Sequence, residues 1–339
     1  MNPNPPRRSS PACTPALALV LASGLTLGPL AGCRSTTAPG VDRSSEAQAE
    51  AHLADAERLL DGGLEDEALA ALRLALEDDP FLVDAHLGEA HIYRGRGQTE
   101  EALAAFQRAG AIDPGNFDAA YGGALMQHLA GRLLAAVDGY LRAIELDPDS
   151  FDAARDLGAA YLQLGQPDAA LAPAERATRL DPSAQPAWSN LAVAQGMLGD
   201  WEAAVASYRR AAELGSLDTP MLLGLANAHL QLGNAERAAN VLASMQRRGA
   251  TLRGHERLGY AYFKLGRLDE ALEQYDAAAA LDPTDVPSLN GRAITHLALH
   301  HQRPGPNPFH RVMGVAGLRA SLQQQPNQAR LIDLLSRYR

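Results

Sequence analysis

Small and large apolar residues follow a pattern that returns every 34 residues along most of this chain. Proline marks the period, because Pro80, Pro114, Pro148 and Pro182 are each 34 residues apart. Between successive prolines lie two amphipathic stretches of about a dozen residues, separated by glycine. Glycine permits the left-handed backbone that ends a helix, and proline cannot continue one. The pattern therefore predicts one helical hairpin per period.

The repeats align when each is numbered internally from 1 to 34 and they begin at residues 49, 83, 117, 151, 185, 219 and 252. Each then has a small residue at position 8, glycine at position 15 and alanine at position 20. Helices approach closely only where side chains are small, and a larger residue fills the space beside them. We expect position 24 to supply that larger residue in most repeats: Leu72, Phe106, Tyr140, Ala174, Tyr208, Leu242 and Tyr275.

An eighth repeat begins at Val286 and is interrupted by the segment HHQRPGPNPFH at 300–310. The pattern resumes so that Pro326 stands at position 32 and Gly314 at position 20. Eighteen residues separate positions 11 and 20 where nine are expected, so nine residues are inserted. The ranges predicted from this reading are an inserted loop at 302–310, a second helix at 311–325 and an amphipathic capping helix at 326–339.

The period and its position-specific residues resemble the tetratricopeptide repeat (TPR) family over about residues 49–339. The resemblance implies an all-α fold, a right-handed α-α superhelix of about eight helix-turn-helix repeats plus the capping helix. Repeats 1–7 and the first helix of repeat 8 would occupy residues 49–301. Because one hairpin cannot bury its apolar face alone, the hairpins must stack.

Members of this family bind protein or peptide segments in a concave groove formed by the first helix of each repeat. The resemblance places groove-facing side chains at positions 2, 5, 6, 9, 12 and 13. The lysines and asparagines with which chaperone-binding members clamp a carboxylate are absent from the matching positions, which argues against recognition of a C-terminal carboxylate. The groove residues expected in this chain include Tyr121, Leu125, His128, Arg155, Asp156, Asn190, Val193, Met197, Leu223, Asn227, Arg257, Tyr260 and Lys264.

Residues 1–32 have the features of a secretory signal peptide. Two arginines precede an apolar run of about 16 residues, which is shorter than the roughly 20 that a membrane-spanning helix needs. The run ends in Leu-Ala-Gly-Cys, which resembles the lipobox of bacterial lipoproteins and implies cleavage before Cys33 and acylation of its thiol. Cys13 would be removed, and a single remaining cysteine cannot form an internal disulfide.

The residues after Cys33 predict where the protein is held. Arg34 stands where an aspartate would resemble the inner-membrane retention signal, so we expect a lipid-anchored protein of the bacterial cell envelope, at the outer membrane and facing the periplasm. Residues 33–48 contain the lipidated cysteine followed by small polar residues without an apolar period. We expect this stretch to be a flexible tether.

Composition and motifs narrow the function further. The net charge is −10 and Lys264 is the only lysine, which argues against nucleic-acid binding because that requires basic residues to neutralise phosphates. The sequence has no nucleophile motif, no glycine-rich phosphate loop and no HExxH, so we expect neither an enzyme nor a bound cofactor. His300, His301 and His310 could converge on a metal, but no cysteine or carboxylate joins them, and we expect a surface loop.

The sequence thus favours a non-enzymatic interaction scaffold, anchored by Cys33, that holds a protein or peptide segment in its groove. Such a scaffold could assist assembly of a pilus, a secretion machine or outer-membrane proteins. One alternative is a repeat component of a sugar-transferring enzyme complex, although the repeats use up the chain to Arg339. Another is a periplasmic binding protein that senses metal or pH through its histidine loop. No small-molecule substrate is evident.

Overall fold

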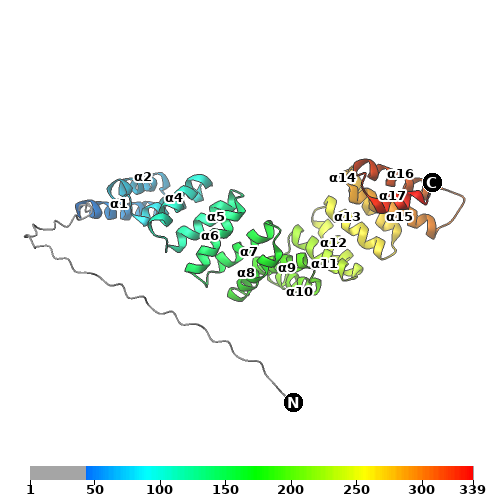
Figure 1. The fold of residues 1–339 in the computed structure, drawn as a ribbon, viewed down its shortest axis with the longest axis horizontal. Helices are drawn as coiled ribbons and strands as arrows, with labels where there is room; N and C mark the ends of the chain where they lie inside the picture. Colours follow the sequence, from blue (N-terminus) through cyan, green and yellow to red (C-terminus); the bar gives the residue numbers. More distant parts are fainter. Residues whose placement is uncertain (1–42, 339) are drawn as a thin grey trace, which may run out of the picture. The chain divides into compact units, whose positions relative to one another are not determined.

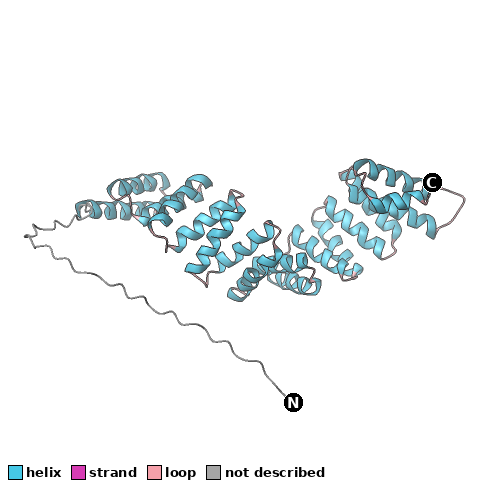
Figure 2. Cartoon of the chain, viewed as in Figure 1, coloured by secondary structure: helices cyan, strands magenta, loops and turns pink. Residues whose placement is uncertain are grey.

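The computed structural model describes residues 43–338, and every regular element in that range is a helix (Figures 1 and 2). The signal peptide, the lipobox and Cys33 lie outside the described residues. None of the described helices is long and apolar enough to cross a bilayer. The helices are α1 Arg43–Asp61, α2 Glu65–Asp78, α3 Val83–Gly95, α4 Thr99–Ile112, α5 Phe117–Leu129, α6 Leu133–Leu146, α7 Phe151–Gln163, α8 Pro167–Leu180, α9 Gln185–Leu198, α10 Trp201–Leu214, α11 Thr219–Gln231, α12 Ala235–Arg248, α13 Leu252–Lys264, α14 Leu268–Leu281, α15 Val286–Gln302, α16 Phe309–Gln324 and α17 Ala329–Ser336.

The helices pair and stack in chain order from α1 to α16, which confirms the expected all-α superhelix of eight hairpins. Each odd-numbered helix packs against the even-numbered helix that follows it, and that helix packs against the next hairpin. Successive odd-numbered helices from α3 to α15 also contact each other, whereas within residues 43–338 no two even-numbered helices do so to a comparable extent. The odd-numbered helices therefore line the inner, concave side of the stack.

The residues that define the repeat form its core, as expected. Alanine at position 20 is fully buried in all seven regular repeats, and the position 24 residues are at most 3% exposed. In four repeats the position 24 side chain lies against a glycine at position 6 of the next repeat. A β-carbon added at Gly122 would lie 2.4 Å from the Phe106 ring, and one at Gly224 would lie closer still to Tyr208. These glycines leave room for large core side chains that reach across the junction.

Glycine at position 15 ends the first helix of each of the seven regular repeats with φ between 70° and 84°. Residues with a β-carbon rarely adopt this conformation, which explains the fixed glycine. The eighth repeat lacks the glycine, and α15 continues for 17 residues where most of the other first helices have 13. The helix α16 has 16 residues where the other second helices have 14. The inserted residues are therefore divided between both helices and a loop at 303–308, and the expected loop at 302–310 was too long.

The two ends of the stack differ from each other. The helix α1 begins at Arg43, so the last residues of the expected tether at 33–48 are helical. The hydroxyl of Ser45 donates a hydrogen bond to the Asp78 carbonyl, and Ala49 is buried, which ties this first turn to the stack. At the other end, the expected capping helix is α17, shorter than its predicted range. Its three leucines and Tyr338, two residues beyond its end, pack against the core of repeat 8: Leu331, Leu334, Leu335 and Tyr338.

Candidate binding groove

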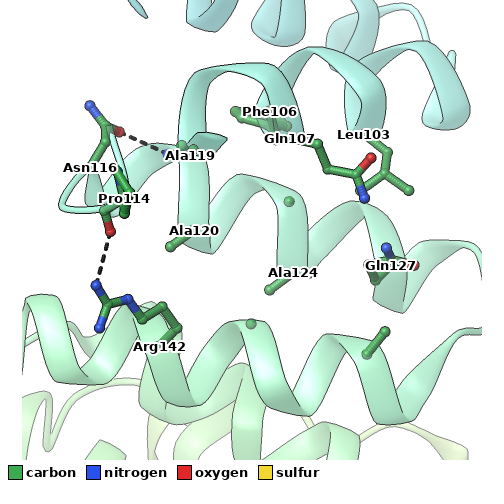
Figure 3. Close-up of a pocket in the computed structure, with 14 residues that line it drawn as sticks. Leu103, Phe106, Gln107, Pro114, Asn116, Ala119, Ala120, Ala124, Gln127 and Arg142 are labelled. Carbon is green, nitrogen blue, oxygen red and sulfur yellow. Dashed lines mark hydrogen bonds between the residues drawn. The ribbon is translucent and has the colours of Figure 1, made fainter. Parts of the chain in front are cut away.

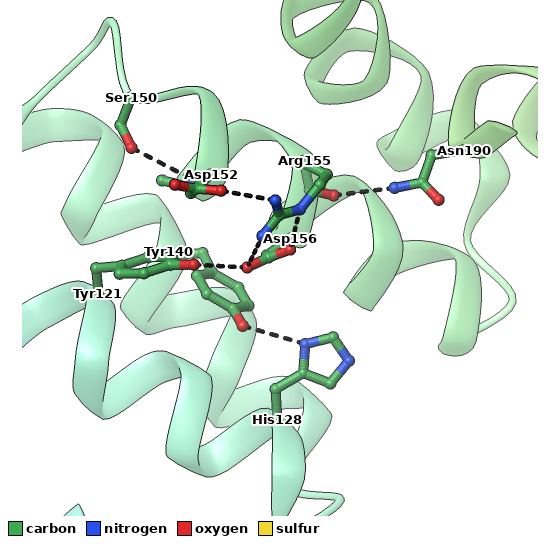
Figure 4. A network of polar contacts seen from close by, with 9 residues as sticks. Tyr121, His128, Tyr140, Ser150, Asp152, Arg155, Asp156 and Asn190 are labelled. Carbon is green, nitrogen blue, oxygen red and sulfur yellow. Dashed lines mark hydrogen bonds and ion pairs between the residues drawn. The ribbon is translucent and has the colours of Figure 1, made fainter. Parts of the chain in front are cut away.

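The expected groove residues lie on five consecutive odd-numbered helices, α5, α7, α9, α11 and α13, whose contacts define the concave side. Five of them meet in one polar network across α5, α7 and α9 (Figure 4). Three others lie at a hollow between α9 and α11, and three more lie along α13. Leu125 and Leu223 are partly buried and pack against core clusters, so they support the groove from below.

The polar network is centred on Asp156 of α7 (Figure 4). The Tyr121 hydroxyl donates to Asp156 Oδ2 at 2.8 Å, which joins repeats 3 and 4. Arg155 donates through Nε to Asp156 Oδ1 at 2.7 Å, and a second guanidinium nitrogen lies 2.6 Å from Asp152 Oδ1. Asn190 of α9 donates to the Arg155 carbonyl at 3.2 Å and extends the network to repeat 5. Three repeats are thus connected by side chains of the groove floor.

A second branch of the network connects the groove to the core. Tyr140, at position 24 of repeat 3, is fully buried, and its hydroxyl is hydrogen-bonded to His128 Nδ1 at 3.1 Å. The sequence identified Tyr140 as a packing residue and did not reveal this bond, and it did not single out Asp152. The signal that could have found Asp152 is its spacing of three residues from Arg155, which brings two helical side chains together.

The charge of Arg155 in this network is balanced by neighbouring carboxylates. Arg155 is enclosed by two carboxylates, and its hydrogen bonds to Asp156 raise the pKa of the guanidinium further above its ordinary value. Burial and the nearby Asp156 charge raise the pKa of both Tyr121 and Tyr140, so both hydroxyls stay neutral at physiological pH. With two carboxylates and one guanidinium, the network presents excess negative charge to the groove.

A hollow of about 570 Å³ lies in the groove between α9 and α11. Val193, Met197 and Asn227 of the expected set line it. Two aromatic residues of α10 also line it: Trp201, the first residue of the helix, and the buried Tyr208. Two of its lining residues are glycines: Gly196, and Gly224, against which the Tyr208 ring packs. Met197 is 49% exposed, so the apolar wall is open to solvent.

Charge changes sign along the groove. The residues at position 2 of the first four repeats are acidic, whereas repeat 7 has Arg253 at this position and Arg257 and Lys264 nearby. Arg257 lies 3.5 Å from the buried Glu256, and Tyr260 of the same helix is 39% exposed. The acidic position 2 residues are Glu50, Asp84, Asp118 and Asp152.

Family models match the sequence in the same repeats that form the groove. A model described as TPR repeat matches residues 125–165 and 259–299, and one described as tetratricopeptide repeat matches residues 155–219. The chain carries tetratricopeptide repeats. The matches include Arg155, Asp156 and Asn190 of the polar network and the α9 side of the hollow. No curated protein sequence matches the chain.

Solved TPR structures share the fold at low sequence identity. The structure of pilF from Pseudomonas aeruginosa is 22% identical with a TM-score of 0.52, and the match covers 63% of this chain and 98% of that one. A tetratricopeptide repeat protein from Parabacteroides merdae is 16% identical with a TM-score of 0.50, over 74% of this chain and 99% of that one. The Cut9–Hcn1 structure of the APC/C is 19% identical with a TM-score of 0.54, and the match covers 88% of this chain and 57% of that one. These likenesses concern the fold alone.

The histidines of the last TPR hairpin do not gather into one site. His310 faces His296, with their Nδ1 atoms 3.0 Å apart, whereas His301 is hydrogen-bonded to the Tyr338 hydroxyl at the capping helix. Within residues 43–338 no three metal-ligating side chains form a group that could hold a metal ion. His296 and His229, both at position 11, are buried, and burial lowers the pKa of each.

Proposed function

We propose that the protein is a non-enzymatic scaffold that holds a segment of another protein in its concave groove. TPR folds generally mediate protein–protein interactions. The observation that carries the proposal is the hollow between α9 and α11, because an exposed apolar recess with Trp201 and Tyr208 in its wall provides an anchor for a large partner side chain. The polar network beside it is already hydrogen-bonded, so its side chains are ordered before a partner arrives.

Binding at a preformed groove limits the ordering cost of association. Tyr121, Asp156 and Asn190 are fixed by bonds across repeats, so little rotamer freedom remains to be lost. The groove has acidic residues at position 2 of repeats 1–4 and basic residues in repeat 7. This supports a partner segment with basic residues beside repeats 1–4 and acidic residues beside repeat 7. Such complementarity favours one orientation of the segment and disfavours its reverse.

The proposal includes a membrane anchor at Cys33, which the lipobox sequence supports. Acylation at about 0.8 kcal/mol per buried CH₂ gives stable attachment when two or more chains are present. The stack would then stand in the bacterial cell envelope, where a scaffold serves assembly of a larger machine. The helical start at Arg43 leaves fewer than ten residues between the anchor and the stack.

The groove is tested by filling its hollow with a side chain from the same helix. Gly196→Leu fits the backbone, because an added β-carbon comes no closer than 3.8 Å to Ala204 and Trp201. The matched control is Ala172→Leu, which adds to an exposed position on the even-numbered helix α8. Crosslinked pull-downs from the native envelope, quantified by mass spectrometry, should show partners that are captured by wild type and Ala172→Leu and lost from Gly196→Leu. Equal capture by all three proteins would refute groove binding.

A further inference from the structure

A second recess lies between α4, α5 and α6, away from the groove positions (Figure 3). It has a volume of about 350 Å³, near the lower end of the roughly 300–1,000 Å³ of small-ligand pockets. None of its lining residues occupies a groove position of the repeat. Phe106 and Leu103 of α4 form one wall, and the Pro114 carbonyl and Arg142 lie at its edge. We call this recess the socket.

The socket exists because the junction of repeats 2 and 3 lacks three side chains that other junctions have. Its residues at position 28 of repeat 2 and at positions 4 and 7 of repeat 3 are Gly110, Ala120 and Gly123. The next junction also has alanine at position 4, but Ile144 and Leu157 occupy the other two positions. Every other junction has at least one large side chain among these positions. The socket is thus the volume left by three small side chains at a junction that is otherwise packed like the rest of the stack.

The junction of repeats 4 and 5 shows what fills the corresponding place. There position 4 is Trp188, and its Nε1 donates a hydrogen bond of 3.0 Å to the carbonyl of Pro182, at position 32 of the preceding repeat. At the junction of repeats 1 and 2, a ring nitrogen of His86 is bonded in the same way to the Pro80 carbonyl at 3.1 Å. A nitrogen heterocycle from position 4 bonded to the position 32 carbonyl is therefore a recurrent arrangement in this chain.

The socket retains the acceptor of this arrangement, the position 32 carbonyl, without the ring, and it has a second acceptor in Gln127. The Pro114 carbonyl is at its edge and accepts one bond from Arg142 at 3.1 Å (Figure 3). A carbonyl oxygen has two lone pairs, so it can accept a second donor. Gln127 also lines the socket, and its Oε1 is buried without a hydrogen-bond partner among the described residues. A buried acceptor without a donor is costly, and a ligand N–H would relieve that cost.

We propose that the socket binds an indole ring, the side chain of a tryptophan presented by a segment of a partner protein. The ring would fill the place that Trp188 fills two junctions along, and its N–H would donate to the Pro114 carbonyl or to Gln127 Oε1. This site is independent of the groove, because its lining residues occupy other positions of the repeat. A partner could therefore occupy both surfaces, or two partners one each.

The test uses N-acetyltryptophanamide as the probe and saturation-transfer NMR with the full chain in detergent micelles. The 1-methyl derivative keeps the ring and lacks the N–H, so it should bind about three- to tenfold more weakly. Free indole is a second probe. Binding of indole without binding of N-acetyltryptophanamide would show a site for a free small molecule and would overturn the assignment to a partner's tryptophan.

Two variants place a larger side chain in the socket and should block probe binding without unfolding the protein. Gly123→Leu adds the residue that repeats 4 to 7 have at position 7, and a β-carbon there meets Phe106 at an ordinary 3.7 Å. Ala120→Trp places an indole at position 4, as in repeat 5. Both should abolish the wild-type signal in the same micelles, and Ala120→Trp should also raise the melting temperature. Gly196→Leu, in the groove, should bind the probe as wild type does.

The possible outcomes separate the two proposals. Equal probe binding by wild type and a folded Gly123→Leu variant, or no binding above the micelle background in wild type, would overturn the socket proposal and leave the groove untouched. Loss of partner capture by Gly196→Leu together with probe binding equal to that of wild type is the result expected when both proposals hold. Circular dichroism of each variant checks that the helices remain.

Discussion

The paired glycines of α5 offer a stringent test of how the junctions are packed. Gly122 and Gly123 are adjacent in one helix, so alanine at either position should gain the same helix propensity, about 1 kcal/mol relative to glycine. Their surroundings differ. An alanine β-carbon at position 122 would lie 2.4 Å from two carbons of the Phe106 ring, whereas at position 123 it would lie 3.7 Å from the Phe106 β-carbon.

The expected magnitudes follow from these distances. The Phe106 side chain is fully buried in a core cluster, so moving its ring away from position 122 would break core contacts. Overpacking of this kind costs about 1–3 kcal/mol, which offsets or exceeds the propensity gain. Gly123→Ala should therefore stabilise the protein by up to about 1 kcal/mol. Gly122→Ala should be less stable than Gly123→Ala by about 1–3 kcal/mol.

Urea denaturation followed by circular dichroism measures this difference on the full chain. Because a stack of repeats can unfold in parts, the two variants are compared with each other at the same signal. Combining Gly122→Ala with Phe106→Leu should recover part of the loss, since the shorter side chain removes the contact. A Gly122→Ala variant as stable as Gly123→Ala would refute the junction packing described above.

Three further outcomes follow from the structure. Cys33→Ser should move the mature protein from the detergent phase to the aqueous phase in a two-phase separation; unchanged partitioning would exclude lipidation. Burial holds the pKa of His229 and His296 below the 6.5 of an exposed histidine. The unfolded chain therefore binds more protons below that pH, and stability should fall as pH falls from about 7. A melting temperature equal at pH 5.5 and 7.5 would contradict this. Asp156→Asn should lower stability by about 1–3 kcal/mol, because the partly buried Arg155 guanidinium loses one of its two charged partners and Tyr121 loses a charged acceptor; Asp149→Asn, at an exposed turn, should have no such effect.

The fold could be predicted from sequence because its contacts recur. Alanine at position 20 and the position 24 side chains are identifiable by period alone, and each is buried where the period places it. Pro173 shows the limit of such rules. Proline inside a helix removes a backbone hydrogen bond and often ends or kinks the helix, yet α8 runs over its regular range from Pro167 to Leu180 with Pro173 inside it.

The site was predictable in part. The groove positions gave Tyr121, Arg155 and Asp156 as separate candidates, because a repeat pattern assigns faces and not partners. The bond from Tyr121 to Asp156 joins residues 35 apart in sequence, so it depends on how far the side chains reach between stacked helices. The socket had no sequence signal in any single repeat, because it arises from three small residues on two helices that meet only in space.

The inserted loop of the last hairpin has a practical consequence for work with this protein. Residues 303–308 are all exposed, while the helices on either side keep their core contacts through Leu297 and Leu318. Length has therefore already been added at this turn without disturbing the hairpin. An affinity tag or a fluorophore placed there would report on the intact protein and leave both the groove and the socket free.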